Sequence, residues 1–346
     1  MKWMVGYQLC ESDDFMQEIL RQREKIQEIY FSWGNLPNGR HTALQHPDLL
    51  PWQVQQRQMQ DLQCLQNAGF SFNLLLNGNC YGRQSLARSF LIFLCDTVED
   101  LSNRYRLVSV TTTSPVIARC LKENFPELEI RASVNMEIGT EQGMDYLSDC
   151  FDSYYMKREC NRNLRQIQRL KRWCNARGKK LYMLANSGCF NDCSARQFHD
   201  NLVAHENEIR EMDNAVTFHG VCADYLERET DKSVFLRRLN FVRPEDMHLY
   251  EEYFTAAKLA TRVTRYPARI LRAYAEGHYS GNILDLLEPN HAQRFYPNVL
   301  ENRRIPEDFG ERVMTCEQDC AVCDYCQKVF QTATVALTKE MEPSDS

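Results

Sequence analysis

The sequence predicts a (β/α)8 TIM barrel followed by a cysteine-rich extension, and three observations support this prediction. Eight short apolar segments alternate with longer amphipathic segments through most of the chain. Most of the short segments are rich in Val, Ile, Leu, Phe or Tyr, as expected for strands buried on both faces. No glycine-rich dinucleotide fingerprint follows the first of them. That absence favours a barrel over the alternative, an open doubly wound sheet.

The predicted strands, taken in chain order, are residues 3–9, 29–33, 72–76, 107–111, 130–134, 151–155, 181–184 and 234–236. Helices are expected between them, and several have a recognisable first residue. Ser114 followed by Pro115 is typical of an N-cap and the first helical position. Pro51 and Pro244 suit the same first position. We expect a barrel over residues 1–262 and an extension over residues 263–346 that packs its cysteines over the barrel mouth.

Composition limits the classes of function. The chain has 41 Lys plus Arg against 47 Asp plus Glu, a net charge of −6, which weakens any general attraction to phosphate backbones. A basic segment over residues 156–180 keeps a nucleic-acid or acidic-partner surface as an alternative to a solvated helix face. No apolar run approaches the ~20 residues needed to span a bilayer, and the first residues lack the pattern of a signal peptide. We therefore expect a cytoplasmic protein without membrane or nucleic-acid partners.

Four cysteines close to the end of the chain are the strongest local signal, in the pattern Cys316-x3-Cys320-x2-Cys323-x2-Cys326. Such short spacings return the chain to one point, so that several thiolates can surround one metal centre. In a reducing compartment, clustered thiols more often ligate metal than form disulfides. Four thiolates serve zinc or an iron–sulfur cluster equally well, so both metals remain open.

A second cysteine pair, Cys189 and Cys193, directly follows the seventh predicted strand. In a barrel this position lies at the C-terminal mouth, where active sites are built. Two thiolates cannot complete a four-coordinate site, so we expect the extension to fold back and supply two or more of Cys316, Cys320, Cys323 and Cys326. Cys222 and Cys80 are reserve ligands, although a single buried cysteine is usually an apolar filler.

Polar side chains follow several predicted strands and are candidates for binding substrate. Amides can orient a polar molecule through paired donors and acceptors, and arginines clamp carboxylates. An asparagine after a strand is also a common turn former, which is the alternative for each amide. The candidate substrate-binding residues are Asn79, Arg83, Asn135, Arg158, Asn186, Asn240 and Arg243.

With these motifs the chain resembles the collagenase-like peptidase family of TIM barrels. The resemblance rests on the strand order, on residues 186–193 with the following Arg196-Gln-Phe-His199, and on the terminal cysteines. It implies a [4Fe-4S] cluster on four cysteines, because the better understood members carry one. These members include oxygen-independent hydroxylases of a ubiquinone precursor and of RNA bases, which take oxygen from prephenate. The resemblance therefore implies oxidoreductase chemistry on a small molecule or peptide, with prephenate as a possible carboxylate partner.

Departures from the family pattern leave the ligand set, the substrate and the need for a second barrel subunit open. Where members commonly have an E-G-R run, this chain has Arg237-Arg-Leu-Asn-Phe-Val-Arg243. Two alternative functions remain. One is a peptidase-like hydrolase, although neither an H-E-x-x-H helix nor a G-x-S-x-G elbow is present. The other is a non-catalytic protein in which zinc or a cluster only fixes the extension to the barrel.

Overall fold

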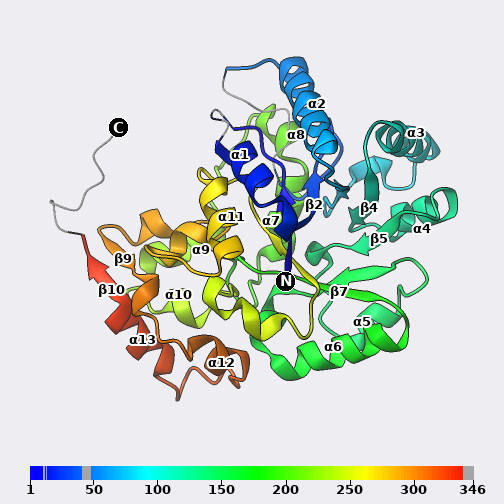
Figure 1. The fold of residues 1–346 in the computed structure, drawn as a ribbon. Helices are drawn as coiled ribbons and strands as arrows, with labels where there is room; N and C mark the ends of the chain where they lie inside the picture. The colour runs from blue at the N-terminus through cyan, green and yellow to red at the C-terminus, as the bar shows by residue number, and fades with distance from the viewer. Residues whose placement is uncertain (11, 13, 41–47, 338–346) are drawn as a thin grey trace.

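The computed structural model describes residues 1–337 except for residues 11, 13 and 41–47, and it contains a closed barrel of eight parallel strands (Figure 1). Each strand pairs with the next one along the chain, and the eighth pairs with the first. The strands are β1 (Lys2–Gly6), β2 (Ile26–Phe31), β3 (Phe72–Leu76), β4 (Leu107–Thr112), β5 (Glu129–Ala132), β6 (Ser153–Tyr155), β7 (Lys180–Leu184) and β8 (Ala256–Leu259). The predicted fold class is therefore confirmed.

Seven of the eight predicted strands are confirmed, with shifts of up to three residues at their ends. The eighth prediction was wrong, because residues 234–236 lie in the short helix α10 (Val234–Arg237). The true β8 reads Ala-Ala-Lys-Leu. It has no β-branched or aromatic residue and it contains a lysine, so composition gave no strand signal. This strand carries a residue that is central to the mouth.

Helices surround the barrel, and several begin as their sequences predict. Ser114 caps α4 by accepting a hydrogen bond from the amide of Ile117 (3.3 Å), and Pro51 is the first residue of α2. Apart from α10, the helices that follow the first seven strands are α1 (Asp14–Arg21), α2 (Pro51–Asn67), α3 (Arg88–Arg104), α4 (Pro115–Asn124), α5 (Glu141–Asp145), α6 (Leu164–Ala176), α7 (Arg196–Ala204), α8 (Glu206–Arg210) and α9 (Val221–Arg228). After β8 come α11 (Pro267–Glu276), α12 (Phe309–Met314) and α13 (Tyr325–Ala333). Short 3₁₀ turns include η4 (Arg158–Arg162) and η5 (Pro244–Tyr250).

Helix α11 follows β8 and packs against α1, so it completes the ring of helices. The barrel unit thus continues past residue 262, where the sequence placed the boundary, to about the end of α11. Within the described ranges, none of the helices combines the length and apolar character that crossing a bilayer requires.

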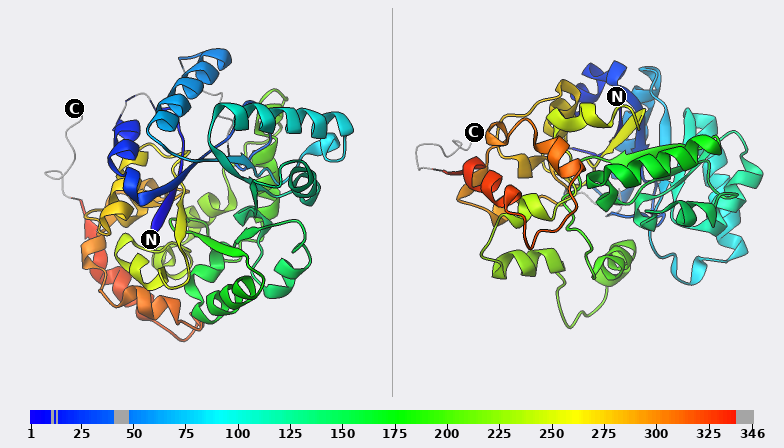
Figure 2. Two further views of the ribbon diagram at one scale, coloured as in Figure 1. Left: turned by 45° about the vertical axis from the view of Figure 1, so that its right-hand side comes forward. Right: turned by 90° about the horizontal axis from the view of Figure 1, so that it is seen from below.

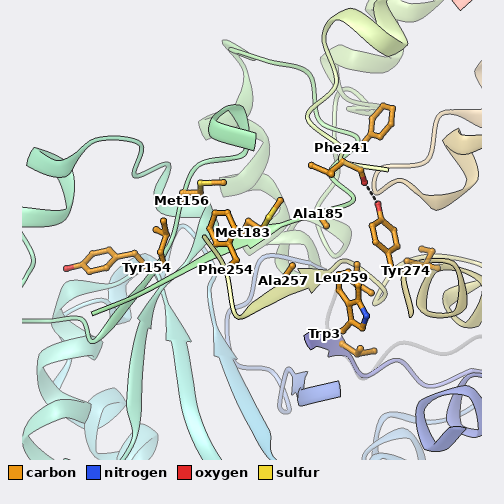
Figure 3. Close-up of a cluster of buried hydrophobic side chains, with 14 of the residues drawn as sticks. Trp3, Tyr154, Met156, Met183, Ala185, Phe241, Phe254, Ala257, Leu259 and Tyr274 are labelled. Atoms are coloured by element: carbon orange, nitrogen blue, oxygen red, sulfur yellow. Dashed lines mark hydrogen bonds between the residues drawn. The ribbon is translucent and has the colours of Figure 1, made fainter. Parts of the chain in front are cut away.

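Side chains alternate between the inside and the outside of the barrel along each strand. On β8, Ala256 belongs to the cluster that fills the barrel, whereas Ala257 and Leu259 belong to the larger core between strands and helices. Figure 3 shows part of that outer core, with Trp3 beside Leu259 and with Met183 farther along the same layer. It also shows Tyr274 of α11, whose hydroxyl donates a 2.7 Å hydrogen bond to the Val242 carbonyl oxygen.

A buried ion pair lies deep in the barrel interior. Arg131 of β5 donates two hydrogen bonds to Glu28 of β2, at 2.5 and 2.9 Å, and both side chains are almost completely inaccessible. Ser109 donates to the same carboxylate, and Glu129 accepts a further bond from Arg131 at 2.8 Å. These contacts pair the buried charges with one another, as burial of charge requires. We call this part of the barrel interior the lower layer.

The extension lies on one side of the barrel in both views of Figure 2, as the orange and red segments. Arg243, buried at the start of η5, pairs with Asp246 at 2.7 Å and donates to the carbonyl oxygens of Ile305 and Pro306. Strands β9 (Asn298–Leu300) and β10 (Thr334–Ala336) form a separate antiparallel pair. The extension is therefore fixed to the barrel through backbone contacts with Arg243.

Replacing Glu28 by Gln should lower the free energy of unfolding by about 3 kcal/mol, because Arg131 keeps its charge but loses its main partner. The measurement is urea-induced unfolding at pH 7. Asp100→Asn is the matched control, since it breaks the exposed Arg104–Asp100 pair, for which a loss below about 1 kcal/mol is expected. Equal losses in the two variants would contradict the role assigned to the interior pair.

Glu129 should make the barrel sensitive to acid. Burial alone would raise the pKa of Glu129, but Arg131, Lys180 and Ser153 lower it to about 2. The folded pKa lies below the unfolded one, so this contribution is present above pH 4.5 and is lost as the pH falls toward 2. Glu129→Gln should therefore flatten the loss of stability between pH 5 and 3, measured by urea unfolding. A variant with an unchanged pH dependence would show that Glu129 does not contribute.

Candidate functional site

A pocket opens at the C-terminal ends of the barrel strands, at the position where TIM-barrel enzymes place their active sites. The space inside it that a water molecule can reach is about 40 Å³, which is room for a few water molecules or one small anion. Its walls come from the ends of six strands, all but β1 and β4, and from the loops after β2 and η6 (Ile283–Leu286). The lining residues are Tyr30, Gly39, Arg40, Asn77, Val134, Asn135, Arg158, Leu184, Lys258, Ala260, Arg262, Val263 and Glu288.

The ionisable lining is strongly cationic. Arg40, Arg158, Lys258 and Arg262 face the pocket, and Glu288 is the only carboxylate among the lining residues. Arg40 pairs with Glu288 at 2.5 Å. Burial would raise the pKa of Glu288, but Arg40 and the other arginines hold it below its usual value, so the carboxylate is ionised. One negative charge thus opposes four potentially positive groups, which suits an anionic ligand.

Arg40 is held by a contact between loops that requires a glycine. The amide of Gly39 donates to Asn77 Oδ1 (3.1 Å), and a Cβ atom on Gly39 would collide with the Asn135 side chain. Asn135 in turn donates to the Asn77 carbonyl oxygen at 3.2 Å. The loop after β2 therefore lies directly on the ends of β3 and β5, and this places Arg40 in the pocket.

Arg158 follows β6 and has one free donor. It pairs with Glu137 at 2.5 Å and donates to Asn135 Oδ1 at 2.8 Å. Its Nε atom is buried and has no hydrogen-bond partner in the described part of the chain. A buried guanidinium donor without an acceptor is costly, and an anionic ligand in the pocket would relieve that cost.

Glu288 comes from the extension and reaches the pocket through residues 186–188. The amide of Glu288 donates to the Asn186 carbonyl oxygen (3.0 Å), and the amide of Gly188 donates to the Glu288 carbonyl oxygen (2.8 Å). A Cβ on Gly188 would lie far too close to the Pro289 carbonyl oxygen. Gly188 therefore permits the extension to dock on this segment, and the docked extension places the Glu288 carboxylate in the pocket.

Lys258 of β8 points into the barrel below the mouth. Its Nζ lies 4.1 Å from the centroid of the Tyr30 ring and 5.3 Å from that of Tyr155. Burial, and then the positive charges of Arg262 and Arg40, hold the pKa of Lys258 well below its usual value. The pocket thus contains an amine whose protonated form is disfavoured.

Three thiols lie near residues 186–188, the segment beside this pocket. Burial raises the pKa of Cys222, and Cys189 and, more weakly, Cys193 raise it further, so both lie within electrostatic reach of Cys222. Arg40 is buried, and its pKa is nevertheless raised by Glu288 and, more weakly, by Cys189. The Cys189 thiol therefore lies within electrostatic reach of the anion-binding pocket. We call Cys189, Cys193 and Cys222 the mouth thiols.

The four terminal cysteines form a separate group, the terminal quartet. Burial raises the pKa of Cys326 to about 11, with contributions from the other three thiols, while Arg162 lowers it. Arg162 lies in η4, and its Nε and Nη2 atoms have no hydrogen-bond partner among the described residues. Glu317, inside the quartet, lies 3.5 Å from Arg165 at the start of α6. The quartet therefore packs against η4 and α6.

The predicted meeting of the two cysteine groups is not found. Among the described residues, no group of three or more His, Cys, Asp or Glu side chains is placed to hold a metal ion. The mouth thiols and the terminal quartet have different neighbours, Arg40 in one case and Arg162 in the other. The extension does reach the mouth, as expected, but it does so through Glu288 and not through its cysteines.

Cys80, named above as a reserve ligand, has another partner. Hydrogen bonding to His205 lowers the pKa of the Cys80 thiol, and the same contact raises the pKa of His205. His205 Nδ1 lies 3.3 Å from Glu208 Oε2. His205 and Glu208 line a groove on the outside of the mouth, between the loops after β2 and β3 and helices α7 and α8, and Cys80 directly precedes the lining residues 81–84. No local pattern indicated this thiol–imidazole–carboxylate arrangement, because Cys80 is more than 120 residues from His205 and Glu208.

The candidate substrate-binding residues divide into three groups. Asn135 and Arg158 line the pocket, and Asn79 lies beside it with its amide 3.4 Å from the Asn135 carbonyl oxygen. Arg83 lies in the outer groove. The remaining three are buried and use their donors on the protein itself, namely Asn186, Asn240 and Arg243.

Sequence reasoning missed four ionisable residues of the pocket: Arg40, Lys258, Arg262 and Glu288. Arg40 lies in a loop with no motif, and Glu288 lies far along the chain from the strands that it meets. Lys258 and Arg262 were overlooked because β8 was not recognised. A lysine inside an otherwise apolar run near residue 258 was the one signal that could have identified them.

Comparisons with known proteins bear on the fold. No family model and no curated protein matches the chain. Among solved structures, a U32 peptidase aligns with a TM-score of 0.53 and 17% identity, covering 75% of this chain and 91% of the other. The chain shares the fold of a U32 peptidase. This agrees with the resemblance to the collagenase-like peptidase family.

Two further solved structures are more distant. A GH113 β-1,4-mannanase aligns with a TM-score of 0.39 at 8% identity, covering 80% of this chain and 98% of the other. A phosphodiesterase of Oleispira antarctica aligns with a TM-score of 0.34 at 12% identity, covering 62% and 91%.

Replacing Arg158 by Met should weaken the binding of malonate, a small dicarboxylate, by about tenfold, because one charge-assisted contact is lost. Isothermal titration calorimetry measures this directly. Arg83→Met is the matched control, since Arg83 lies outside the pocket, and its affinity should equal that of the unmodified protein. Equal weakening by both variants would show that malonate does not bind in the pocket.

Proposed function

We propose that this chain is an iron–sulfur enzyme that carries out a redox modification of a small carboxylate-bearing molecule at the barrel mouth. The reaction class is oxygen-independent hydroxylation or a related redox step. The observation that carries the proposal is the cationic pocket with the Cys189 thiol close to Arg40. This arrangement puts an anion-binding site and a group of potential metal ligands side by side at the end of the barrel where catalysis occurs.

The pocket residues have distinct parts in substrate binding. Arg158 is paired with Glu137 but keeps a buried Nε donor without an acceptor among the described residues, and Arg262 lines the same pocket, so both can donate to carboxylates. Asn135 and Asn77 lie in the same wall and present amides that orient a polar group. A molecule with more than one carboxylate, such as prephenate, matches this lining in charge.

The mouth thiols are the donors that we assign to the cluster. Iron–sulfur clusters are held by cysteine thiolates, and these three thiols would supply three of the four ligands that a [4Fe-4S] cluster takes. Arg40 and Arg196 are both within electrostatic reach of Cys189, and their positive charges would balance the negative charge of a thiolate-ligated cluster. When bound, the cluster would supply one-electron redox chemistry, while the arginines hold the substrate beside it.

The terminal quartet has the donor set of a second metal centre, either zinc or a cluster. The unpartnered Nε and Nη2 donors of Arg162 support this assignment, because thiolate sulfurs bound to a metal accept hydrogen bonds from such groups. In this position, at η4 and α6, a metal would stabilise the extension and take no part in the reaction.

Anaerobic purification followed by iron, sulfide and zinc analysis tests these assignments. Cys189→Ser combined with Cys193→Ser should remove the iron and sulfide of the mouth cluster, which is all of the iron and sulfide if the quartet holds zinc. Cys320→Ala combined with Cys323→Ala should leave the mouth cluster in place and remove only the second metal. A protein without iron after anaerobic preparation would contradict the proposal, as would a mouth double variant with the same iron and sulfide content as the unmodified protein.

A thiol hydrolase is the second candidate function, and the contacts of Cys80, His205 and Glu208 favour it. A thiol beside an imidazole that is oriented by a carboxylate is the arrangement of a nucleophile and its base. The U32 peptidase that shares this fold adds support. Hydrolysis of fluorescent casein that is lost in Cys80→Ser and retained in Cys64→Ser would support this function. Hydrolysis that persists in Cys80→Ser, or that is absent from the unmodified protein, would exclude it.

A further inference from the structure

We propose that Lys258 forms a Schiff base with a small 2-oxo acid bound in the mouth pocket. The inference rests on the carboxylate-binding part of the proposed function and not on the iron–sulfur cluster. It assigns a covalent role to a residue that the redox chemistry does not use, and it names the chemical class of the ligand.

The first support is the position of the amine. Lys258 lies on β8 one residue before the end of the strand, and it lines the pocket together with Tyr30 and Arg262. Only 7% of the residue is exposed. An amine at the bottom of an enclosed pocket meets ligands that enter from the mouth and is shielded from bulk water, as Schiff-base chemistry requires.

The second support is that Lys258 neutralises no acid. Glu28 favours protonation of Lys258 but is bonded to Arg131, and Glu288, which lines the same pocket, is bonded to Arg40. Among the residues that the structure describes, Nζ of Lys258 takes part in no hydrogen bond or ion pair, and its close neighbours are aromatic rings. A lysine with a purely structural role in a barrel interior would be expected to pair with a carboxylate.

The third support is the surrounding charge. Arg262, Arg40 and Arg158 all oppose protonation of the amine, and Glu28 alone favours it. An ordinary lysine keeps only about one neutral amine in a thousand at pH 7. Burial and the neighbouring cations lower the pKa of Lys258 and so make the nucleophilic form abundant.

The same cations select the ligand. A 2-oxo acid carries a carboxylate directly beside its carbonyl carbon, so an arginine that binds the carboxylate brings the carbonyl to the amine. Nζ attacks the carbonyl carbon to give a carbinolamine. The two amine protons then leave with the former carbonyl oxygen as water, and a carbon–nitrogen double bond remains. No oxidant or reductant is consumed.

Reductive trapping tests the proposal on the full chain. The protein is incubated with pyruvate and sodium cyanoborohydride at pH 7, and peptide mapping by mass spectrometry locates the added group. Modification of Lys258 should be about tenfold or more faster than that of exposed lysines. Excess malonate, which lacks the carbonyl, should slow it by competition. Modification of Lys258 no faster than that of Lys171, a lysine outside the pocket, would overturn the proposal.

Two variants make the result specific. Lys258→Arg should lose the rapid labelling, whereas Lys171→Arg should retain it at position 258. The Cys189→Ser and Cys193→Ser double variant should also retain it, because the amine does not depend on the cluster. Rapid labelling in a protein without iron would refute the cluster and leave this inference intact. An iron-containing protein that binds malonate but is not labelled at Lys258 would refute this inference alone.

Discussion

The structure depends on how charges are buried inside the barrel. In the lower layer, Glu28 and Arg131 satisfy each other, so the interior there is electrically balanced. In the upper layer, four cationic side chains line the pocket, where Glu288 pairs with Arg40 and Glu137 pairs with Arg158. Burying positive charge without partners is costly, and burial together with the charges of Arg262 and Arg40 lowers the pKa of Lys258. The same imbalance makes the mouth a site for anions.

The extension completes the mouth by adding its one carboxylate. Docking of residues 286–289 on the segment after β7 places Glu288 against Arg40, and Gly188 makes the close approach possible. Arg243 fixes a later part of the extension near η5. The cysteines consequently fall into two groups with separate surroundings, the mouth thiols and the terminal quartet. This separation is the reason for proposing two metal centres with different roles and not one shared centre.

Much of the fold could be predicted from the sequence, because buried parallel strands such as Phe72–Leu76 are continuous apolar runs. Strand β8 could not, since Ala and Lys carry no strand preference and only pairing with β1 and β7 defines it. For the site, Asn135 and Arg158 were found because they follow strand ends. Arg40 and Glu288 act through a contact between positions 248 residues apart, which no local pattern reveals. The single metal centre expected from both cysteine groups required the two groups to be close in space. Spacing along the sequence cannot establish such proximity.

The most direct test of the charge imbalance is a pH titration of the Lys258 amine. NMR of the protein with isotope-labelled lysine side chains monitors this titration, and the Lys258→Arg variant assigns the Lys258 signal. An uncompensated cationic pocket predicts a pKa well below 10.5 for this amine. It also predicts that saturating malonate raises this pKa, because a bound anion stabilises the ammonium form. A Lys258 amine that titrates near 10.5 and does not respond to malonate would contradict the anion-binding mouth.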